Sequence, residues 1–349
     1  MTDKATTPTA TGRSQSAIRN LQSEILNLVV GWPKAEVHLH LEGAVEIETL
    51  EELAACRGLP PPPADLYDYP DFDGFLKAFK MVCDYLAGPA EYETITGKLL
   101  GRLQQQGVVY AEIYVAAGVL LWQQKPLEAI FEGIEAGYRR ARAEGGPEAR
   151  WIFDATRQFG AEAAMEMTRR AVPLRDRGVI GIGIGGDEER GAPELFREVY
   201  AYARAEGLRL TAHAGETAGP ESIWGALREL GAERIGHGLA AARDARLVEH
   251  LAEKQVPVDI CLSSNLRTGA IRAIEEHPLR SFLDAGLLVS LSTDDPAMFG
   301  TDLAGEYLLA HEGLGLSIAE LRRLVANSFR ASFQGRTFTT EPQRTQRKT

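Results

Sequence analysis

Eight strand-like segments, most of them followed by an amphipathic helix, constrain the fold of this 349-residue chain more than any other feature. The first is at residues 36–43, and the other seven are at residues 108–116, 150–156, 179–185, 208–214, 234–238, 257–262 and 287–292. Short apolar runs separated by helical patterns are typical of βαβ units, whose strands pair in parallel. Eight such units predict an α/β fold, the closed (β/α)8 TIM barrel.

The helices predicted between and after these strands have the length of crossover helices. They are at residues 127–143, 161–175, 193–205, 220–230, 244–253, 278–285, 303–314 and 318–333. The alternative fold, a doubly wound open sheet, favours a glycine-rich phosphate loop after the first strand. The sequence Leu-Glu-Gly-Ala at residues 41–44 is not such a loop, so the barrel is preferred.

Additional helices are predicted outside the eight units. One precedes the first strand at residues 14–30, and three more fill the insertion after it, at residues 46–57, 71–86 and 90–106. An insertion at this point of the chain is a natural place for a substrate lid. The polar segments 1–13 and 334–349 are predicted to be disordered tails. Residues 14–333 are therefore predicted to form a single domain.

Composition narrows the class of protein. Hydrophobic residues make up 44% and charged residues 25% of the chain, as in ordinary globular proteins. The net charge of −11 argues against a nucleic-acid partner, which requires a basic face. No apolar run reaches the roughly 18 residues of a membrane span, and the first residues lack the apolar region of a secretory signal. Three cysteines without CxxC spacing favour a reducing, cytoplasmic location. The oligomeric state is not predicted.

Polar residues gather at the carboxyl ends of the predicted strands, which is where TIM barrels place their active sites. A single histidine at such a position is equally well explained as an ordinary core residue. Four of the seven histidines, however, fall at one predicted barrel mouth. The residues at strand ends are His38, His40 and Glu42, which alternate on one face of the first strand, and His213, His237, Asp294 and Asp295.

Three imidazoles and one carboxylate form the ligand set of a catalytic zinc site, which water completes. We therefore predict that His38, His40, His213 and Asp294 bind one Zn²⁺. Fe²⁺ or Mn²⁺ would also suit these ligands, because affinity order alone does not choose among the metals. A bound catalytic metal lowers the pKa of its water toward ~7 and so supplies hydroxide at neutral pH.

Four further residues are predicted to act on the water or the substrate. His237 lies on the strand beside His213 and is predicted to hold or deprotonate the water. Glu216, in the turn after the fifth strand, is a candidate acid for the substrate. Adjacent carboxylates diverge, so Asp295 is expected to face the substrate. The absence of a side chain at Gly186 allows a flat ring to approach the backbone closely.

The sequence resembles the adenosine deaminase family of the metal-dependent amidohydrolases. The resemblance extends from about residue 33 to about residue 333, and its motifs occur in order at the predicted strand ends. The motifs are Pro33-Lys-Ala-Glu-Val-His-Leu-His-Leu-Glu-Gly43, Gly185-Gly-Asp-Glu188, His213-Ala-Gly-Glu216, Arg234-Ile-Gly-His-Gly238, Cys261-Leu-Ser-Ser-Asn265 and Ser292-Thr-Asp-Asp-Pro296.

The resemblance implies hydrolytic deamination of a 6-aminopurine nucleoside, with adenosine giving inosine and ammonia. It implies the same zinc ligands, with Glu216 protonating purine N1 and His237 acting on the zinc water. Asp295 would bond near N7 and the attacking oxygen, and the Gly186 backbone would contact N3. His40 is also expected to border the substrate.

One departure from the family pattern leaves the 5′ substituent open. Many adenosine deaminases carry Asp where this chain has Glu42, on the 5′ side of the ribose. The substrate alternatives are therefore 6-amino-6-deoxyfutalosine, a menaquinone precursor, and adenine. Leu262 replaces a frequent Pro and Ser292 a frequent Asn, with small expected effects. Residues 217–224 and 298–303 resemble the bacterial adenosine deaminase-like branch.

Other classes of protein fit less well. A binuclear amidohydrolase usually needs a bridging Lys or Glu on a middle strand, and residues 150–156 and 179–186 contain no Lys. The H-x-E and P-C-x-x-C signature of cytidine-type deaminases is absent. An inactive binding protein on the same barrel would be expected to lack Glu216 or a metal ligand, and the chain retains them all.

Overall fold

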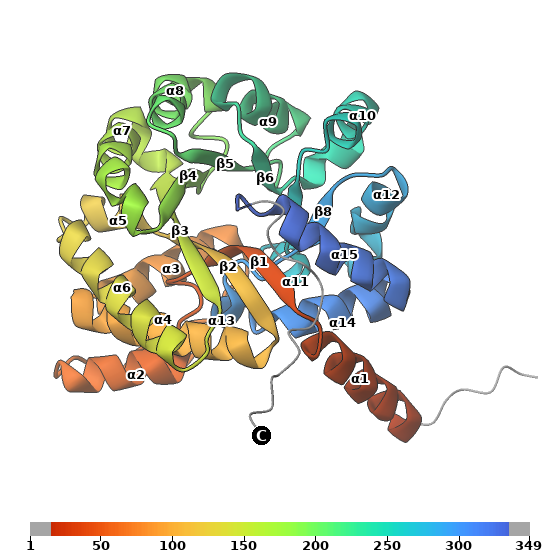
Figure 1. Cartoon of the computed structure of the whole chain (residues 1–349), viewed down its shortest axis with the longest axis horizontal. Helices are drawn as coiled ribbons and strands as arrows, with labels where there is room; N and C mark the ends of the chain where they lie inside the picture. Colours follow the sequence, from red (N-terminus) through yellow and green to blue (C-terminus); the bar gives the residue numbers. More distant parts are fainter. Residues whose placement is uncertain (1–14, 335–349) are drawn as a thin grey trace, which may run out of the picture.

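A single parallel sheet of eight strands forms the centre of the structure, a computed structural model that describes residues 15–334. Each strand pairs with the next in chain order (Figure 1), and the strands are β1 (Lys34–His40), β2 (Val108–Val115), β3 (Glu148–Thr156), β4 (Val179–Gly185), β5 (Arg209–Ala214), β6 (Arg234–His237), β7 (Val258–Ile260) and β8 (Val289–Leu291). A parallel bridge between Leu39 of β1 and Asp294, which follows β8, joins the two edges of the sheet. The predicted (β/α)8 barrel is confirmed.

Helices surround the sheet. They are α1 (Gln15–Val30), α2 (Ile47–Cys56), α3 (Phe72–Tyr85), α4 (Pro89–Gln105), α5 (Ala117–Trp122), α6 (Leu127–Ala143), α7 (Gly160–Ala171), α8 (Arg197–Ala205), α9 (Pro220–Gly225), α10 (Ala245–Lys254), α11 (Leu262–Arg267), α12 (Leu279–Asp284), α13 (Pro296–Phe299), α14 (Leu303–Leu314) and α15 (Ile318–Ala331). Shorter helical turns are η1 (Arg157–Phe159), η2 (Val172–Arg177), η3 (Pro193–Phe196), η4 (Ala226–Leu230), η5 (Leu239–Arg243) and η6 (Ile274–Glu276).

Most predicted elements are present with nearly the predicted bounds, because long helices and buried strands have clear periodicity. Three short helices were not predicted: α5, α11 and α13 follow β2, β7 and β8 directly. Helices of four to six residues are too short for an apolar stripe to be recognised. The first strand also ends earlier than predicted, at His40. Nearly all of the predicted tails, 1–13 and 334–349, lies outside the described residues.

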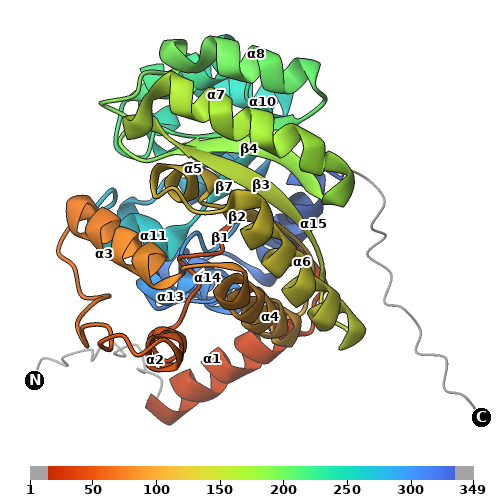
Figure 2. The same cartoon turned by 90° about the vertical axis from the view of Figure 1, so that its left-hand side faces the viewer.

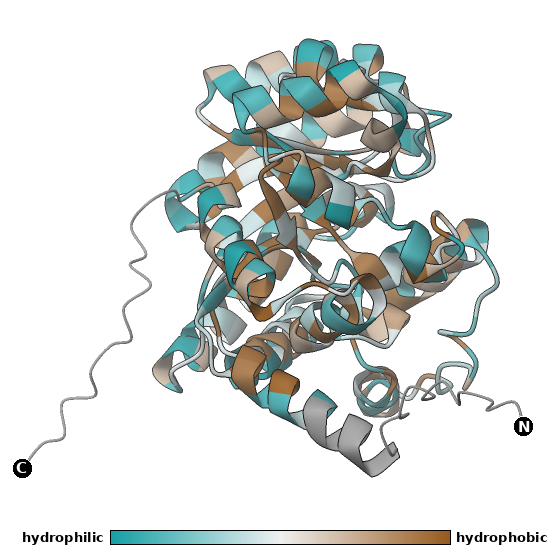
Figure 3. Cartoon of the chain, turned by 90° about the vertical axis from the view of Figure 1, so that its right-hand side faces the viewer, coloured by the Kyte–Doolittle hydropathy of each residue, from teal (hydrophilic) through white to brown (hydrophobic). Residues whose placement is uncertain are grey.

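The core lies between the sheet and the ring of helices. All seven residues of β1 are buried, and so are most apolar side chains of the other strands, Val109 of β2 being an exposed exception. Figure 3 shows the outer helices banded between hydrophilic and hydrophobic residues, as expected when one face packs on a sheet. In the described part of the chain, no helix combines the length and the apolar content that a bilayer crossing needs.

The insertion after β1 places α3 beside the short helices at the carboxyl end of the barrel (Figure 2). Phe75 of α3 stacks on Phe299 of α13, with ring centroids 5.1 Å apart. Tyr69, which precedes α3, donates a hydrogen bond of 2.8 Å to the carbonyl of Met298. These contacts place the aromatic face of α3 against the carboxyl end of the barrel; that this segment covers a substrate stays a prediction.

Candidate active site

The seam between β8 and β1 brings the first potential ligands together. The backbone N–H of His40 donates to the carbonyl of Asp294 at 2.7 Å, and the N–H of Asp294 donates to the carbonyl of His38 at 3.0 Å. Asp294 has a φ of +64°, and His237 at the end of β6 has a φ of +63°. Left-handed backbone at residues other than glycine is uncommon and clusters at functional sites.

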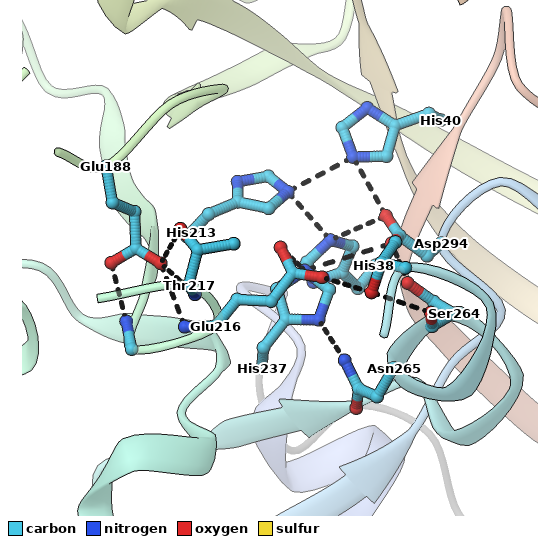
Figure 4. Close-up of polar contacts among 12 residues, drawn as sticks. His38, His40, Glu188, His213, Glu216, Thr217, His237, Ser264, Asn265 and Asp294 are labelled. Carbon is cyan, nitrogen blue, oxygen red and sulfur yellow. Dashed lines mark hydrogen bonds and ion pairs between the residues drawn. The ribbon is translucent and has the colours of Figure 1, made fainter. Parts of the chain in front are cut away.

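Three imidazoles and a carboxylate converge on one point inside the barrel (Figure 4). The Nε2 atom of His213 lies 2.9 Å from Nε2 of His38 and 3.2 Å from Nε2 of His40. Both of those Nε2 atoms also lie 3.2 Å from the same oxygen, Oδ1 of Asp294. Ligands that share a tetrahedral zinc ion are about 3.3 Å apart, because Zn–N bonds are about 2.0–2.1 Å. The four predicted metal ligands are therefore brought together at ligand spacing.

The protonation of two of these imidazoles, His38 and His213, suits metal binding, whereas the charges of Asp295 and Asp294 outweigh burial at His40 and raise its pKa to about 10. Nδ1 of His213 lies 3.0 Å from the carbonyl of Ile184, so its hydrogen lies there and the Nε2 lone pair faces the cluster. Burial lowers the pKa of His38 to about 3 and that of His213 well below its usual range. Neutral imidazole is the form that binds a metal. A cation at this point would accept the Nε2 lone pair of His213 and satisfy the carboxylate of Asp294.

Asp294 is held by groups on both sides. The hydroxyl of Ser264 donates to Oδ2 at 2.7 Å and leaves Oδ1 to the histidines. Burial opposes ionisation of this carboxyl, but the contacts with His38 and His40 outweigh it and hold its pKa well below the usual range. The ligand atoms of His237 and Asp295 also lie close to the cluster. Spacing alone therefore does not exclude these two residues as ligands.

A chain of hydrogen bonds fixes the tautomer of His237. The N–H of Leu279 donates to Nδ1 of His277 at 3.1 Å, so Nε2 of His277 carries the hydrogen that faces Oδ1 of Asn265 at 3.2 Å. The amide nitrogen of Asn265 then donates to Nδ1 of His237 at 3.1 Å. Neutral His237 must therefore carry its hydrogen on Nε2, which lies 3.6 Å from Oε2 of Glu216.

Glu216 lies in the turn after β5, with only 9% of its side chain exposed. Burial raises its pKa to about 7, against the opposing effect of His237. A carboxyl group with that pKa is partly protonated at neutral pH, as a general acid requires. Oγ1 of Thr268 lies 3.3 Å from Oε1 and fixes the carboxyl from the other side.

Glu188 builds the turn that carries Glu216. Its carboxylate accepts hydrogen bonds from the backbone N–H groups of Gly215, Glu216 and Thr217 at 2.7, 2.8 and 2.9 Å, and from the hydroxyl of Ser222. Burial opposes its ionisation, but these donors outweigh it and lower the pKa. The sequence motif contained this residue, although no role was predicted for it.

Three further predicted residues, Asp295, Gly186 and His40, border the cavity. Asp295 and Gly186 line the cavity above the cluster, and Oδ1 of Asp295 is buried without a hydrogen-bond partner. Gly186 has a φ of +90°, and a Cβ atom there would lie 2.3 Å from Oε1 of Gln158. His40 borders both the cluster and the cavity.

The structure does not bring Glu42 into the cavity. Its carboxylate is fully buried behind the wall, where it accepts from the hydroxyl of Tyr92 at 3.0 Å and from the N–H of Ala116 at 3.2 Å. The prediction assumed that the strand alternation continues through Glu42. Because β1 ends at His40, the residues after it turn away from that face.

A buried acid of the cavity was not among the predicted residues. Asp154, near the end of β3, lines the cavity, and its Oδ1 is buried without a hydrogen-bond partner. Burial raises its pKa to about 7. The rule that strand ends carry function would have indicated Asp154 as it indicated His213.

Known proteins show the same fold and sequence pattern. The family model described as adenosine deaminase matches residues 33–339. An aminodeoxyfutalosine deaminase of Streptomyces avermitilis is 38% identical over 318 residues, which cover 89% of each chain. An adenine deaminase of Streptomyces coelicolor is 38% identical over 307 residues, which cover 86% of this chain and 90% of that protein.

A solved structure agrees with these matches. The crystal structure of an amidohydrolase from Burkholderia ambifaria with bound Zn has a TM-score of 0.82 and 27% identity, and the match covers 88% of this chain and 87% of that one. The family match spans most of the chain, and it includes every strand of the barrel and every residue of the histidine cluster. The chain therefore belongs to the adenosine deaminase family of the metal-dependent amidohydrolases, and it is a hydrolytic deaminase.

Proposed function

We propose that this enzyme deaminates a 6-aminopurine nucleoside with one Zn²⁺ per chain, adenosine giving inosine and ammonia being the reference reaction. Action on adenine-type purines agrees with the family that the sequence matches and with the substrates after which its relatives are named. The observation that carries the proposal is the convergence of three Nε2 atoms and Asp294 Oδ1 beside the buried acid Glu216.

The proposed metal ligands are His38, His40, His213 and Asp294. Their spacing and the neutral form of His38 and His213 support this assignment. The Burkholderia ambifaria structure with bound Zn supports zinc as the metal, although the same ligands suit Fe²⁺ or Mn²⁺. When bound, the ion supplies an activated water for attack on purine C6.

Glu216 and His237 divide the proton chemistry. We assign to protonated Glu216 the transfer of a proton to purine N1, which breaks the aromatic conjugation and makes C6 more electrophilic. The Nε2–H of neutral His237 can donate a hydrogen bond to the oxygen that attacks C6. The hydrogen-bond chain through Asn265 therefore favours a holding role for His237 over deprotonation of the water. Oxygen replaces the 6-amino group, which leaves as ammonia.

The cavity wall positions the base. Burial and the charge of Asp294 raise the pKa of Asp295 well above its usual range, so its unpartnered carboxyl can be protonated and donate a hydrogen bond to N7, and the backbone at Gly186 allows close approach at N3. His40 completes the edge beside the metal ligands. These groups orient the purine so that its C6 faces the histidine cluster.

The substituent on the sugar is the open choice. Relatives are named for aminodeoxyfutalosine and for adenine, and the family for adenosine. All three substrates would place the purine beside the histidine cluster. They differ only in the group that extends toward the opening of the cavity.

Metal content and ultraviolet absorbance test the proposal together. We expect one metal atom per chain, and a spectral shift from 6-aminopurine to 6-oxopurine when adenosine, adenine or aminodeoxyfutalosine is added. Two metal atoms per chain would instead favour a binuclear amidohydrolase. A metal-loaded protein that turns over no aminopurine would contradict the proposal and favour a binding protein on this barrel.

A further inference from the structure

The active-site cavity changes character between its floor and its mouth. The floor is polar and contains the histidine cluster, Glu216 and the two aspartates Asp154 and Asp295. The mouth is largely aromatic, and its rings come from three separate segments: Phe72, Phe75 and Phe79 from α3, Trp122 from α5 and Phe159 from η1. A 6-aminopurine bound at the floor would therefore direct its sugar substituent toward aromatic surfaces.

Two of these rings form an exposed platform. Trp122 and Phe159 are stacked with centroids 5.2 Å apart and ring planes 9° from parallel. Trp122 nevertheless remains 54% exposed, an unusual state for the largest aromatic side chain. Phe79 connects the platform to the floor, because its ring lies edge-on to His40 at 6.4 Å. A flat apolar group has a place to stack that is continuous with the catalytic cluster.

One cation borders the same platform. Lys80 is the single Lys or Arg among the described residues that line the cavity, and its Nζ lies 5.8 Å from the ring centroid of Trp122. It also pairs with Asp84 at 2.8 Å, but both side chains are about half exposed, so the pair is weak. Lys80 can therefore turn toward an anion that lies over Trp122.

We propose that the part of the mouth formed by Phe79, Lys80, Trp122 and Phe159 is a subsite for an aromatic carboxylate carried on the 5′ side of the nucleoside. The inference rests on the proposed deamination of a 6-aminopurine and specifies its substrate class. Stacking on Trp122 recognises the ring, and Lys80 recognises the single negative charge.

The other substrate classes match this mouth less well. Adenine has no sugar substituent and cannot reach it. The 5′-hydroxyl of adenosine offers nothing to an aromatic platform. A 5′-monophosphate carries about two negative charges and is usually bound by Arg or by several backbone N–H groups. One exposed Lys that already has an acidic partner does not provide such a site.

A set of four substrates tests the inference through kcat/KM. Aminodeoxyfutalosine is the probe, because its 5′ extension ends in a carboxyphenyl group. Its methyl ester keeps the ring and removes the charge, while adenosine and adenosine 5′-monophosphate lack the ring. We expect the highest kcat/KM for aminodeoxyfutalosine, a lower value for its ester and the lowest values for adenosine and its monophosphate.

Two variants separate the contributions of charge and ring. Lys80→Met should raise KM for aminodeoxyfutalosine roughly 2- to 5-fold, the range for an exposed ion pair, and leave the ester and adenosine unchanged. Trp122→Ala should raise KM for both the acid and its ester by roughly 5- to 10-fold without changing kcat for adenosine. Lys77→Met is the matched control on the same helix, because Lys77 is exposed and does not line the cavity.

Clear results would overturn the inference. Equal effects of Lys80→Met on the acid, the ester and adenosine would show that Lys80 does not read the carboxylate. A preference for adenosine or its monophosphate would contradict the aromatic subsite while the proposed deamination stands. Deamination of none of the four compounds by the metal-loaded wild-type enzyme would instead contradict the proposed function itself.

Discussion

Strand β6 begins with Arg234 and ends with His237, and each of these residues belongs to a buried polar cluster inside the barrel. Around Arg234, every charge has an opposite charge next to it. Its guanidinium pairs with Glu112 and, at 2.9 Å, with Asp259, and it donates to the carbonyls of Val37 and Ala331.

The cluster around His237 is different. The Nε2 atoms of His38, His40 and His213 face one another and Asp294 Oδ1, and single oxygens of Asp154 and Asp295 are buried without partners. Burying polar atoms without partners costs free energy. The Arg234 cluster therefore balances its charges internally, with Nε of Arg234 and Oδ2 of Asp259 held as an ion pair rather than a hydrogen bond, whereas the His237 cluster would be completed by the proposed ion and substrate. This difference indicates that the first cluster serves the fold and the second serves the chemistry.

The largest expected effect comes from removing a proposed metal ligand from the cluster around His237. His38→Ala should lose the metal and the activity together, with a fall in kcat of at least about 10³-fold, because no activated water is supplied. Metal analysis and steady-state kinetics on the same preparation measure both. A variant that keeps its full metal content would remove His38 from the ligand set.

Glu216→Gln should separate chemistry from metal binding within the same cluster. Glutamine keeps the shape of the side chain but holds no transferable proton, so we expect kcat to fall by about 10²–10⁴-fold with the metal content unchanged. Glu189→Gln is the matched control, since Glu189 is exposed and does not line the cavity. Near wild-type kcat in Glu216→Gln would exclude Glu216 as the acid.

Arg234→Met tests the cluster around Arg234, in which the buried charges pair with one another. It leaves the buried carboxylates of Glu112 and Asp259 without their cation, and breaking such a pair typically costs about 3–5 kcal/mol of unfolding free energy. Denaturant unfolding measures the loss, and kcat per bound metal should be unchanged. Arg209→Met removes an exposed ion pair with Glu233 and should cost less than about 1 kcal/mol. Loss of metal in Arg234→Met would show that the two clusters are coupled.

Strand positions and strand-end chemistry were accessible from the sequence because both depend on local periodicity. The alternation of apolar runs located β1 and β5, and the rule for barrel mouths then indicated that His38 and His213 meet. Their Nε2 atoms lie 2.9 Å apart although 175 residues separate them in sequence. The prediction succeeded because the barrel closure fixes such contacts without knowledge of side-chain packing.

The supporting residues were not accessible in this way. Asn265 and His277 act on His237 through side-chain contacts between α11, a six-residue helix, and the segment before α12. The platform of Trp122 and Phe159 depends on α5, another short helix, lying beside η1. No periodic pattern indicates these contacts, and Glu42 was misplaced because the pattern itself gives no sign that β1 stops at His40.

The pH dependence of kcat/KM tests whether Glu216, in the cluster around His237, is the acid. Burial raises the pKa of Glu216 to about 7, and the protonated form is the one that donates to purine N1. The acid is therefore present below pH 7 and lost above it, so kcat/KM should fall up to about tenfold per pH unit as the pH rises beyond 7. This alkaline decline should be absent in Glu216→Gln. A decline that persists in the variant would assign it to another group.

The smallest expected effect concerns Glu42. This residue lies near the cluster around His237, but its carboxylate has hydrogen-bond partners within the protein, as the charges around Arg234 have theirs. Its carboxylate is satisfied by Tyr92 and Ala116, so Glu42→Asp shortens the side chain and weakens those bonds. We expect a loss of about 1–2 kcal/mol of unfolding free energy, with the metal content unchanged. The ratio of kcat/KM between adenosine and aminodeoxyfutalosine should stay within twofold, because the carboxylate does not line the cavity. A changed ratio with unchanged stability would show instead that Glu42 influences recognition of the 5′ side of the substrate. Residues behind the cavity wall would then contribute to substrate specificity as well as to stability.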